Sequence, residues 1–238
     1  MRASQVPGAL AIVNVIRGLR ALSSRPIHIM ASRSYLSSNK PKKLQIGTGH
    51  NLLDGWLNTD VVIRASGVII LDAKKRFRFG DQVFDFILTE HQIEQLSHSE
   101  ARFMLSECFR VLRPGGKIRI GTPSLETLIG LYTTDKTPIQ SEYIDWITDN
   151  FITGASERKD VAVINHAING FGHKFIYDFE TLKTSLHAVG FGDIVRCELG
   201  ASDSTELSGV DSHGSAVGNE NMTRFETMIL EATRPADG

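Results

Sequence analysis

The stretch "KLQIGTGHNLLDGWLNTD", Lys43–Asp60, decides the fold. It opens as a short apolar strand that runs into Gly-x-Gly, and a second short strand, "WLNTD", ends on an acid. Gly47 and Gly49 lack a Cβ, so a ligand can come close to their backbone. Because ligands of open parallel sheets bind beyond the carboxyl ends of the strands, the stretch predicts a binding site at that edge.

A nucleoside matches this loop better than a dinucleotide does. A dinucleotide loop needs a third glycine for close helix packing and an acid about twenty residues further on. Here Leu52 stands at the glycine position, and Asp60 comes early. A nucleoside without phosphates needs only the glycines and an acid for its ribose, and S-adenosylmethionine is such a ligand. A dinucleotide oxidoreductase is therefore disfavoured.

Two acids end successive apolar segments: Asp60, and Asp72 in "GVIILDA". At the carboxyl edge of a parallel sheet, the first carboxylate would accept hydrogen bonds from ribose hydroxyls, and the second would lie beside an adenine. Aspartate is also a common turn or cap residue, so that alternative stays open for both. Together with the glycines, the pair favours ligand binding.

The rest of the chain alternates strands with helices. Strands are expected at 43–47, 57–62, 67–73, 83–90, 117–123, 193–200 and 224–234, and clear helices at 97–112 and 178–190. Ser97 and Glu100 are spaced as a capping box, and Asp178 is the expected N-cap of the second helix. This alternation predicts an α/β fold, Rossmann-like and doubly wound, with a mostly parallel sheet and helices on both faces.

Two segments interrupt the alternation. Residues 125–172 contain two helical patterns split by "TTDKTP" and are interpreted as an insertion, either a lid over the carboxyl edge or a plain connecting helix pair. Tyr143 and Trp146 within it are expected in a core rather than on a stacking platform. The polar, glycine-rich loop at 201–222 is expected to be functional or partly mobile.

Residues 1–40 form a basic leader, ahead of a domain at 41–238. No Asp or Glu precedes Asp54, and the apolar segment "ALAIVNVIRGLRALSSRP" is followed by further basic residues. Its alternatives are a transit peptide, a basic amphipathic helix in peripheral contact with an anionic membrane, and a first helix packed on the domain, which we favour.

Composition excludes several classes of function. The chain has 238 residues, a formal net charge of -1 and two cysteines. No overall field draws it to nucleic acid, and no basic stripe with interleaved aromatics follows the leader. Two cysteines do not make a disulfide framework and suit a reducing compartment. No apolar run reaches transmembrane length. We therefore expect a cytoplasmic protein, with membrane-peripheral contact left open.

Several motifs carry a family resemblance. The segments "LQIGTG", "GWLNTD", "VIILDA", "FDFILTEHQIEQL" and "ECFRVLRPGGKIRIGTPSLE" resemble the class I S-adenosylmethionine-dependent methyltransferases. The segments "GHKFIYD" and "FETMILEATRP" extend the likeness to a bacterial branch associated with surface-polysaccharide functions. The resemblance covers roughly Lys42 to Pro235 and implies a seven-stranded sheet that ends in an antiparallel hairpin.

By position, the resemblance assigns S-adenosylmethionine contacts and a reaction centre. The residues implied at the cofactor are Gly47, Thr48, Gly49, Asp60, Asp72, Ala73 and Glu90, with Glu90 and His91 near the methyl group or the acceptor. Three positions depart from the branch pattern: Gln45 replaces an acid, Gln95 replaces a histidine, and Ser124 replaces an aspartate. The last two lie on the acceptor side and bear on substrate and activity.

Methyl transfer is an in-line displacement that needs a base only when the acceptor holds its proton. His91 and His173 are the candidate bases because histidine titrates near neutrality, although either could serve only structurally. His91 and Glu94 are spaced as a metal pair but lack an evident third ligand, so no metal is expected.

The sequence thus predicts a methyltransferase that acts on a small-molecule or glycan-type acceptor, with a hydroxyl as the expected acceptor group. A catalytically inactive partner subunit that keeps the fold is the alternative.

Overall fold

The computed structural model describes residues 25–154 and 157–236. The chain divides into two compact units, 1–40 and 41–238. The described part of the first unit holds one helix, α2 (Arg25–Leu36). The predictions made for residues 1–24 of the basic leader lie outside the described residues. Over the described ranges, every helix is too short or too polar to span a bilayer.

The second unit is built on a seven-stranded sheet with the order β3-β2-β1-β4-β5-β7-β6. Its strands are β1 (Lys43–Ile46), β2 (Leu57–Asp60), β3 (Ile69–Ile70), β4 (Phe84–Glu90), β5 (Leu112–Pro123), β6 (Gly192–Cys197) and β7 (Thr227–Thr233). The first five strands run parallel, and β7 is antiparallel to both β5 and β6. The predicted fold class is confirmed, including the antiparallel final hairpin.

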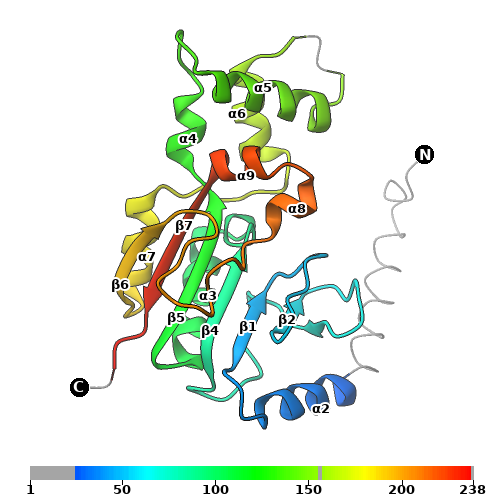
Figure 1. Cartoon of the computed structure of the whole chain (residues 1–238), viewed down its shortest axis with the longest axis vertical. Coiled ribbons are helices and arrows are strands. Elements are labelled where there is room, and N and C mark those ends of the chain that lie inside the picture. The colour runs from blue at the N-terminus through cyan, green and yellow to red at the C-terminus, as the bar shows by residue number, and fades with distance from the viewer. Residues whose placement is uncertain (1–24, 155–156, 237–238) are drawn as a thin grey trace. The chain divides into compact units, whose positions relative to one another are not determined.

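The helices α3 (His98–Val111) and α7 (Phe179–Ala188) lie behind the sheet in Figure 1. Ser97 and Glu100 form the predicted capping box of α3, and Asp178 caps α7 by accepting from the Thr181 amide. Helix α3 buries a stripe of apolar side chains: Ala101, Met104, Leu105, Cys108 and Val111. Both cysteines are free, as expected. The connections from β1 to β2 and from β2 to β3 are loops without helices.

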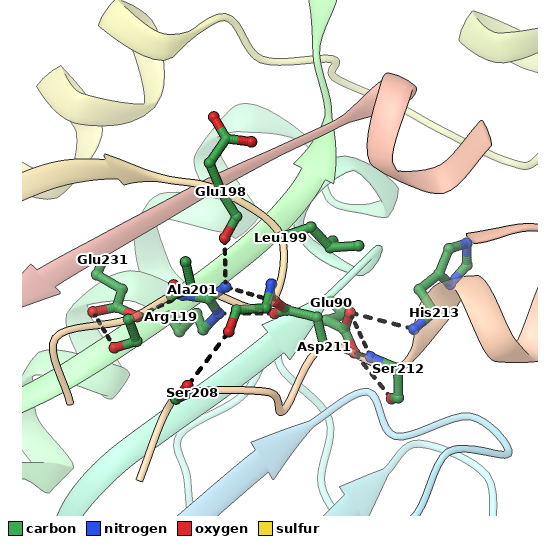
Figure 2. Close-up of polar contacts among 12 residues, drawn as sticks. Glu90, Arg119, Glu198, Leu199, Ala201, Ser208, Asp211, Ser212, His213 and Glu231 are labelled. Carbon is green, nitrogen blue, oxygen red and sulfur yellow. Dashed lines mark hydrogen bonds and ion pairs between the residues drawn. The ribbon is translucent and has the colours of Figure 1, made fainter. Parts of the chain in front are cut away.

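The segment 198–212 crosses in front of β4 and β5 (Figure 1). The sequence interprets 201–222 as a functional or partly mobile loop, and the first part of that loop lies in this segment and packs on the sheet. Leu207 is fully buried against Trp56 and Leu88. Arg119 of β5, also fully buried, holds the segment through ion pairs at 2.5 Å with Asp211 and 2.6 Å with Glu231 of β7. Arg119 donates in addition to the carbonyls of Ala201 and Glu198 (Figure 2).

A helical lobe stands beyond the carboxyl ends of β4 and β5 (Figure 1). It comprises α4 (Leu125–Gly130), α5 (Pro138–Phe151), α6 (Asp160–Asn169) and α9 (Glu220–Glu226), with the short α8 (His213–Val217) nearby. The lobe has its own apolar core, which includes Leu128, Tyr143, Ile147, Val163 and Met222. Three elements differ from the expectation. Helices α6 and α8 were not predicted, and α9 occupies the start of the strand expected at 224–234 because Asn219 caps a helical turn there.

Candidate active site

A cavity of about 450 Å³ opens at the carboxyl ends of β1, β2 and β4. All the residues that the sequence assigned to the cofactor line it, together with one of the two candidate bases: Gly47, Thr48, Gly49, Asp60, Asp72, Ala73, Glu90 and His91. We call it the first cavity. Its size falls within the range of cofactor sites, about 300–1,000 Å³. The structure thus brings together residues that are spread over 45 positions of sequence.

The glycine loop takes a conformation that side chains rarely adopt. Gly47 has φ +75° and Gly49 has φ +55°. A Cβ on Gly47 would lie 2.5 Å from Cγ of Gln92, so a larger residue would displace the neighbouring loop. Around Gly49 there is open space, which leaves its backbone accessible from the cavity. The Thr48 side chain is turned inward, donating at 2.7 Å to the Asn51 carbonyl, so this residue offers its backbone rather than its hydroxyl.

The two acids at the strand ends are held by backbone amides. The Asp60 carboxylate accepts from the amides of Gly49 and Val62, both at 2.9 Å. Each carboxylate oxygen has a second lone pair, so ribose hydroxyls could still donate to it. Burial tends to raise the pKa of Asp72, but hydrogen bonds from Lys75 and the Lys74 amide outweigh it and lower that pKa overall. The hydrogen bonds to Asp72 therefore favour its ionised form.

Glu90 lines the first cavity and also has a structural role. Its carboxylate accepts from the Ser212 amide at 3.0 Å and from the His213 amide at 3.4 Å, which ties α8 to the end of β4 (Figure 2). Burial raises the pKa of Glu90, while the bonds from Ser212 act in the opposite direction. Glu90 therefore lines the cavity and also positions His213.

His91 sits in the left-handed region, at φ 47°. Non-glycine residues in this region are uncommon and cluster at functional sites. Its ring stacks on that of His213, with centroids 3.7 Å apart and planes 13° from parallel. Its Nε2 lies 3.0 Å from Oγ1 of Thr227. Burial, then His213 and His173, hold the pKa of His91 well below its usual range, so the ring is neutral at pH 7.

A buried carboxyl, Glu94, lies between the two predicted bases. Its Oε1 is 3.7 Å from Nδ1 of His91 and 3.9 Å from Nε2 of His173. Within the described residues this oxygen has no hydrogen bond. Burial raises the pKa of Glu94 to about 8, so the carboxyl is protonated at neutral pH. His173 donates from Nδ1 to the Ala167 carbonyl at 2.6 Å, which leaves Nε2 as an acceptor.

A second cavity of about 230 Å³ adjoins the first. The two share His91, Gln95 and His213, which we call the shared wall. His173 lines the second cavity and not the first, so the two predicted bases flank different spaces. Tyr143 and Trp146 also line the second cavity. Tyr143 is buried in the lobe core as expected, but its ring forms part of a cavity wall as well.

Sequence reasoning missed two residues at this place. His213 lay in a loop without a recognisable motif, and Glu226 lay in a segment assigned to a strand. Burial lowers the pKa of His213 to about 4. Burial raises the pKa of Glu226 to about 7, although the hydrogen bond from Tyr143, at 2.5 Å, opposes the rise. Only the fold brings these two residues beside His91.

His91, His213 and Glu226 offer ligand atoms within 4.8 Å of one another. However, the two imidazole rings are nearly parallel, and their lone pairs lie in the ring planes. They therefore do not converge on one point, as a metal site requires.

Residues 55–120 match the family model described as a methyltransferase domain, which is less than half of the chain. Among solved structures, an S-adenosylmethionine-dependent methyltransferase from Archaeoglobus fulgidus is 20% identical, with 91% of this chain and 94% of that chain covered and a TM-score of 0.47. Phosphoethanolamine N-methyltransferase 2 from Haemonchus contortus, in complex with S-adenosylmethionine, is 13% identical over 88% of this chain and 52% of that chain, with a TM-score of 0.42. No curated protein matches the chain.

The residues of the first cavity fit S-adenosylmethionine. Gly47 carries no Cβ that would obstruct the loop. Carboxylates stand at the end of β2 and just after β3. No third glycine is needed because the ligand carries no pyrophosphate. The match over 55–120 covers β2 to most of β5, and so includes β2 and β4, two of the three strands at whose ends this cavity opens, but not β1. Residues 55–120 are thus similar to a methyltransferase domain, and they lie within the sheet that carries the first cavity.

Proposed function

We propose that the chain transfers a methyl group from S-adenosylmethionine in the first cavity to a hydroxyl of a small-molecule or glycan-type acceptor in the second. The observation that carries this proposal is the shared wall, where His91, Gln95 and His213 border both spaces. In-line displacement needs the reacting atoms about 3–3.5 Å apart, so donor and acceptor sites must adjoin. The likeness to a branch associated with surface polysaccharides supports a glycan-type acceptor.

In this proposal, each side of the first cavity has its own task. The backbone of Gly47, Thr48 and Gly49 faces the methionine part of the donor, Asp60 accepts from the ribose, and Asp72 and Ala73 border the adenine. S-Adenosylmethionine supplies a methyl group already activated by its sulfonium. The protein then has to orient the acceptor, exclude water and receive the proton of the hydroxyl.

His91 is the predicted base that touches both cavities. Its ring is neutral, its backbone lies in the left-handed region, and its amide N–H donates a hydrogen bond to the Gly121 carbonyl at 2.8 Å. His173 faces only the second cavity, where we propose that it contacts the acceptor. For residues 1–40, peripheral contact with an anionic membrane is the alternative to the packed helix that we favour.

The first experiment is calorimetric titration with S-adenosylmethionine and S-adenosylhomocysteine, with NAD as the control. Micromolar binding of the first two alone supports the proposal. A folded sample that binds neither supports the alternative of an inactive partner subunit.

His91→Asn then separates binding from turnover, because asparagine tolerates the left-handed backbone. We expect donor binding to be kept and methylation of hydroxyl acceptors to fall at least tenfold. His187→Asn, at an exposed position of α7, is the matched control. Equal turnover in both variants would remove His91 from the reaction.

A further inference from the structure

A continuous arc of aromatic rings lines the second cavity. From Tyr143 the arc passes to Trp146, Phe151, Phe171 and His173, with successive ring centroids 6.2, 5.2, 5.3 and 5.7 Å apart. Aromatic neighbours at 4.5–7 Å hold one another in offset or edge-to-face arrangements. The arc comes from α5 and from the turn after α6, so the lobe supplies it as one packed unit.

From this arc we infer that the acceptor is a small planar aromatic compound with a phenolic hydroxyl, whose proton passes to Glu226 rather than to His91. The inference rests on the proposed function and narrows its acceptor class. Flat π-faces stack offset on aromatic rings, whereas the many hydroxyls of a saccharide need many hydrogen-bond partners. None of the described residues that line the cavity is Lys or Arg, and several of its polar groups already have partners, as Tyr143 does in Glu226 and His91 in Thr227.

The size and charge of the cavity limit the acceptor further. A volume of about 230 Å³ is below the usual range for drug-sized ligands, about 300–1,000 Å³, and suits one or two fused rings. Because no cationic side chain of the described lining could pair with an anion, a phosphorylated or carboxylated acceptor would leave a buried charge unpaired, which is costly.

Glu226 is placed to receive the proton. It lines the second cavity, and one carboxylate oxygen, Oε2, accepts from the Tyr143 hydroxyl. Burial raises the pKa of Glu226 to about 7. A carboxylate with this pKa can accept the proton of a phenol, whose own pKa is about 10. It cannot deprotonate an aliphatic hydroxyl, which resembles water, with a pKa of about 15.7.

The step balances with the groups on hand. The phenolic oxygen forms a bond to the methyl carbon, and the bond from that carbon to sulfur breaks. The sulfonium becomes the neutral thioether of S-adenosylhomocysteine, taking the electron pair of the broken bond. The phenolic proton goes to the Glu226 carboxylate, so no oxidant or further reactant is required.

Binding to the second cavity can be followed without the donor. The chain has two tryptophans, and Trp146 lies in the arc. We expect catechol and 4-methylphenol to quench its fluorescence, and methyl α-glucoside and phenethylammonium to leave it unchanged; Trp146→Leu removes the signal. Quenching by the ammonium compound alone would overturn the inference in favour of a cationic acceptor, and binding of the glucoside alone would overturn it in favour of a saccharide.

Turnover is tested with the same compounds, with methyl transfer detected by mass spectrometry of the product. Phenols should be methylated at least tenfold faster than the glucoside. If S-adenosylmethionine binds and only the glucoside is methylated, the acceptor class is wrong while the proposed function stands. If S-adenosylmethionine does not bind, the proposed function fails, and the fluorescence titration alone decides whether the cavity prefers phenols.

Two variants test the roles of Glu226 and of the arc. Glu226→Gln should lower kcat for phenols about 100-fold or more and leave phenol binding unchanged, whereas Glu220→Gln, exposed on the same helix, should change neither kcat nor binding. Trp146→Leu should raise KM for phenols about tenfold, from lost stacking. Tyr132→Leu, an exposed aromatic of the lobe, is its control. Unchanged kcat in Glu226→Gln would overturn the role of the carboxyl.

Discussion

The two cavities of this protein are built on opposite principles. The first is polar: its carboxylates are held by backbone amides at strand ends, as with Asp60 and the amides of Gly49 and Val62. The second is lined by aromatic rings from a helical lobe, with one carboxyl, Glu226, whose pKa burial raises to about 7. The first suits a polar, cationic ligand, and the second suits a small uncharged one.

The difference shows that the sheet edge and the helical lobe supply different kinds of binding surface. Parallel strands end at one edge and carry short polar loops, so they supply the fixed hydrogen bonds that the first cavity needs. The lobe has its own apolar core, so its inner wall can vary in shape without disturbing the sheet. The stacked pair of His91 and His213 belongs to both cavities and joins the two tasks.

The largest expected effect comes from removing Arg119, which holds the loop that carries His213 of the stacked histidine pair. Arg119→Met would leave Asp211 and Glu231 as buried carboxylates without their cation. We expect the free energy of unfolding to fall by about 3–5 kcal/mol, measured by urea denaturation. Because Asp211 precedes Ser212 and His213, both cavities should weaken together.

The matched control is Arg113→Met, whose partner Asp85 is part-exposed at the surface. That change should cost less than about 1 kcal/mol. If the two variants lose equal stability, segment 198–212 is not held by Arg119. Asp211→Asn, which keeps a hydrogen-bond acceptor, provides a milder variant for binding measurements if Arg119→Met does not fold.

The second prediction separates the cavities. Asp60→Ala removes the proposed acceptor of the ribose hydroxyls. Hydrogen bonds to a charged group contribute about 1.5–3 kcal/mol each, so S-adenosylmethionine should bind about 100-fold more weakly by calorimetry. Phenol binding in the second cavity should not change.

Asp54→Ala, exposed in the same loop, should bind the donor normally, and circular dichroism checks the fold of both variants. Normal donor binding by folded Asp60→Ala would show that the ribose lies elsewhere.

The third prediction concerns Glu94, behind the shared wall. In the folded protein its pKa is raised to about 8 by burial, against an ordinary value of 4.5. Between these values the folded state holds a proton that the unfolded state has released, so stability falls as pH rises. A fully effective group contributes about 1.4 kcal/mol per pH unit.

Glu94→Gln, which keeps the shape of the protonated carboxyl, should flatten that slope between pH 6 and pH 8 in urea denaturation. Glu142→Gln, exposed on α5, should follow the unmodified protein. Parallel slopes in all three proteins would mean that Glu94 is ionised in the fold.

The sequence predicts the first cavity well because its determinants are local. The glycines, Asp60 and Asp72 each follow a short apolar strand, and strand periodicity alone brings them to one edge. The second cavity depends on contacts between residues far apart in sequence. Glu226 was assigned to a strand, and nothing in the pattern around His213 reveals that Arg119, through Asp211, holds its loop against the sheet. Long-range ion pairs of this kind leave no periodic signal.

The smallest expected effect is a shift in the pKa of Glu226 in the second cavity. The hydrogen bond from Tyr143 lowers the pKa of Glu226, against the larger rise caused by burial. Tyr143→Phe removes that bond, worth about 1 kcal/mol, so the pKa of Glu226 should rise by up to about one unit. A base acts in its ionised form, so the rising limb of kcat/KM for a phenol should move to higher pH by the same amount. Tyr132→Phe should leave the limb in place. A loss of packing alone would lower the plateau without moving the limb, so the position of the limb identifies Glu226 as the group that titrates.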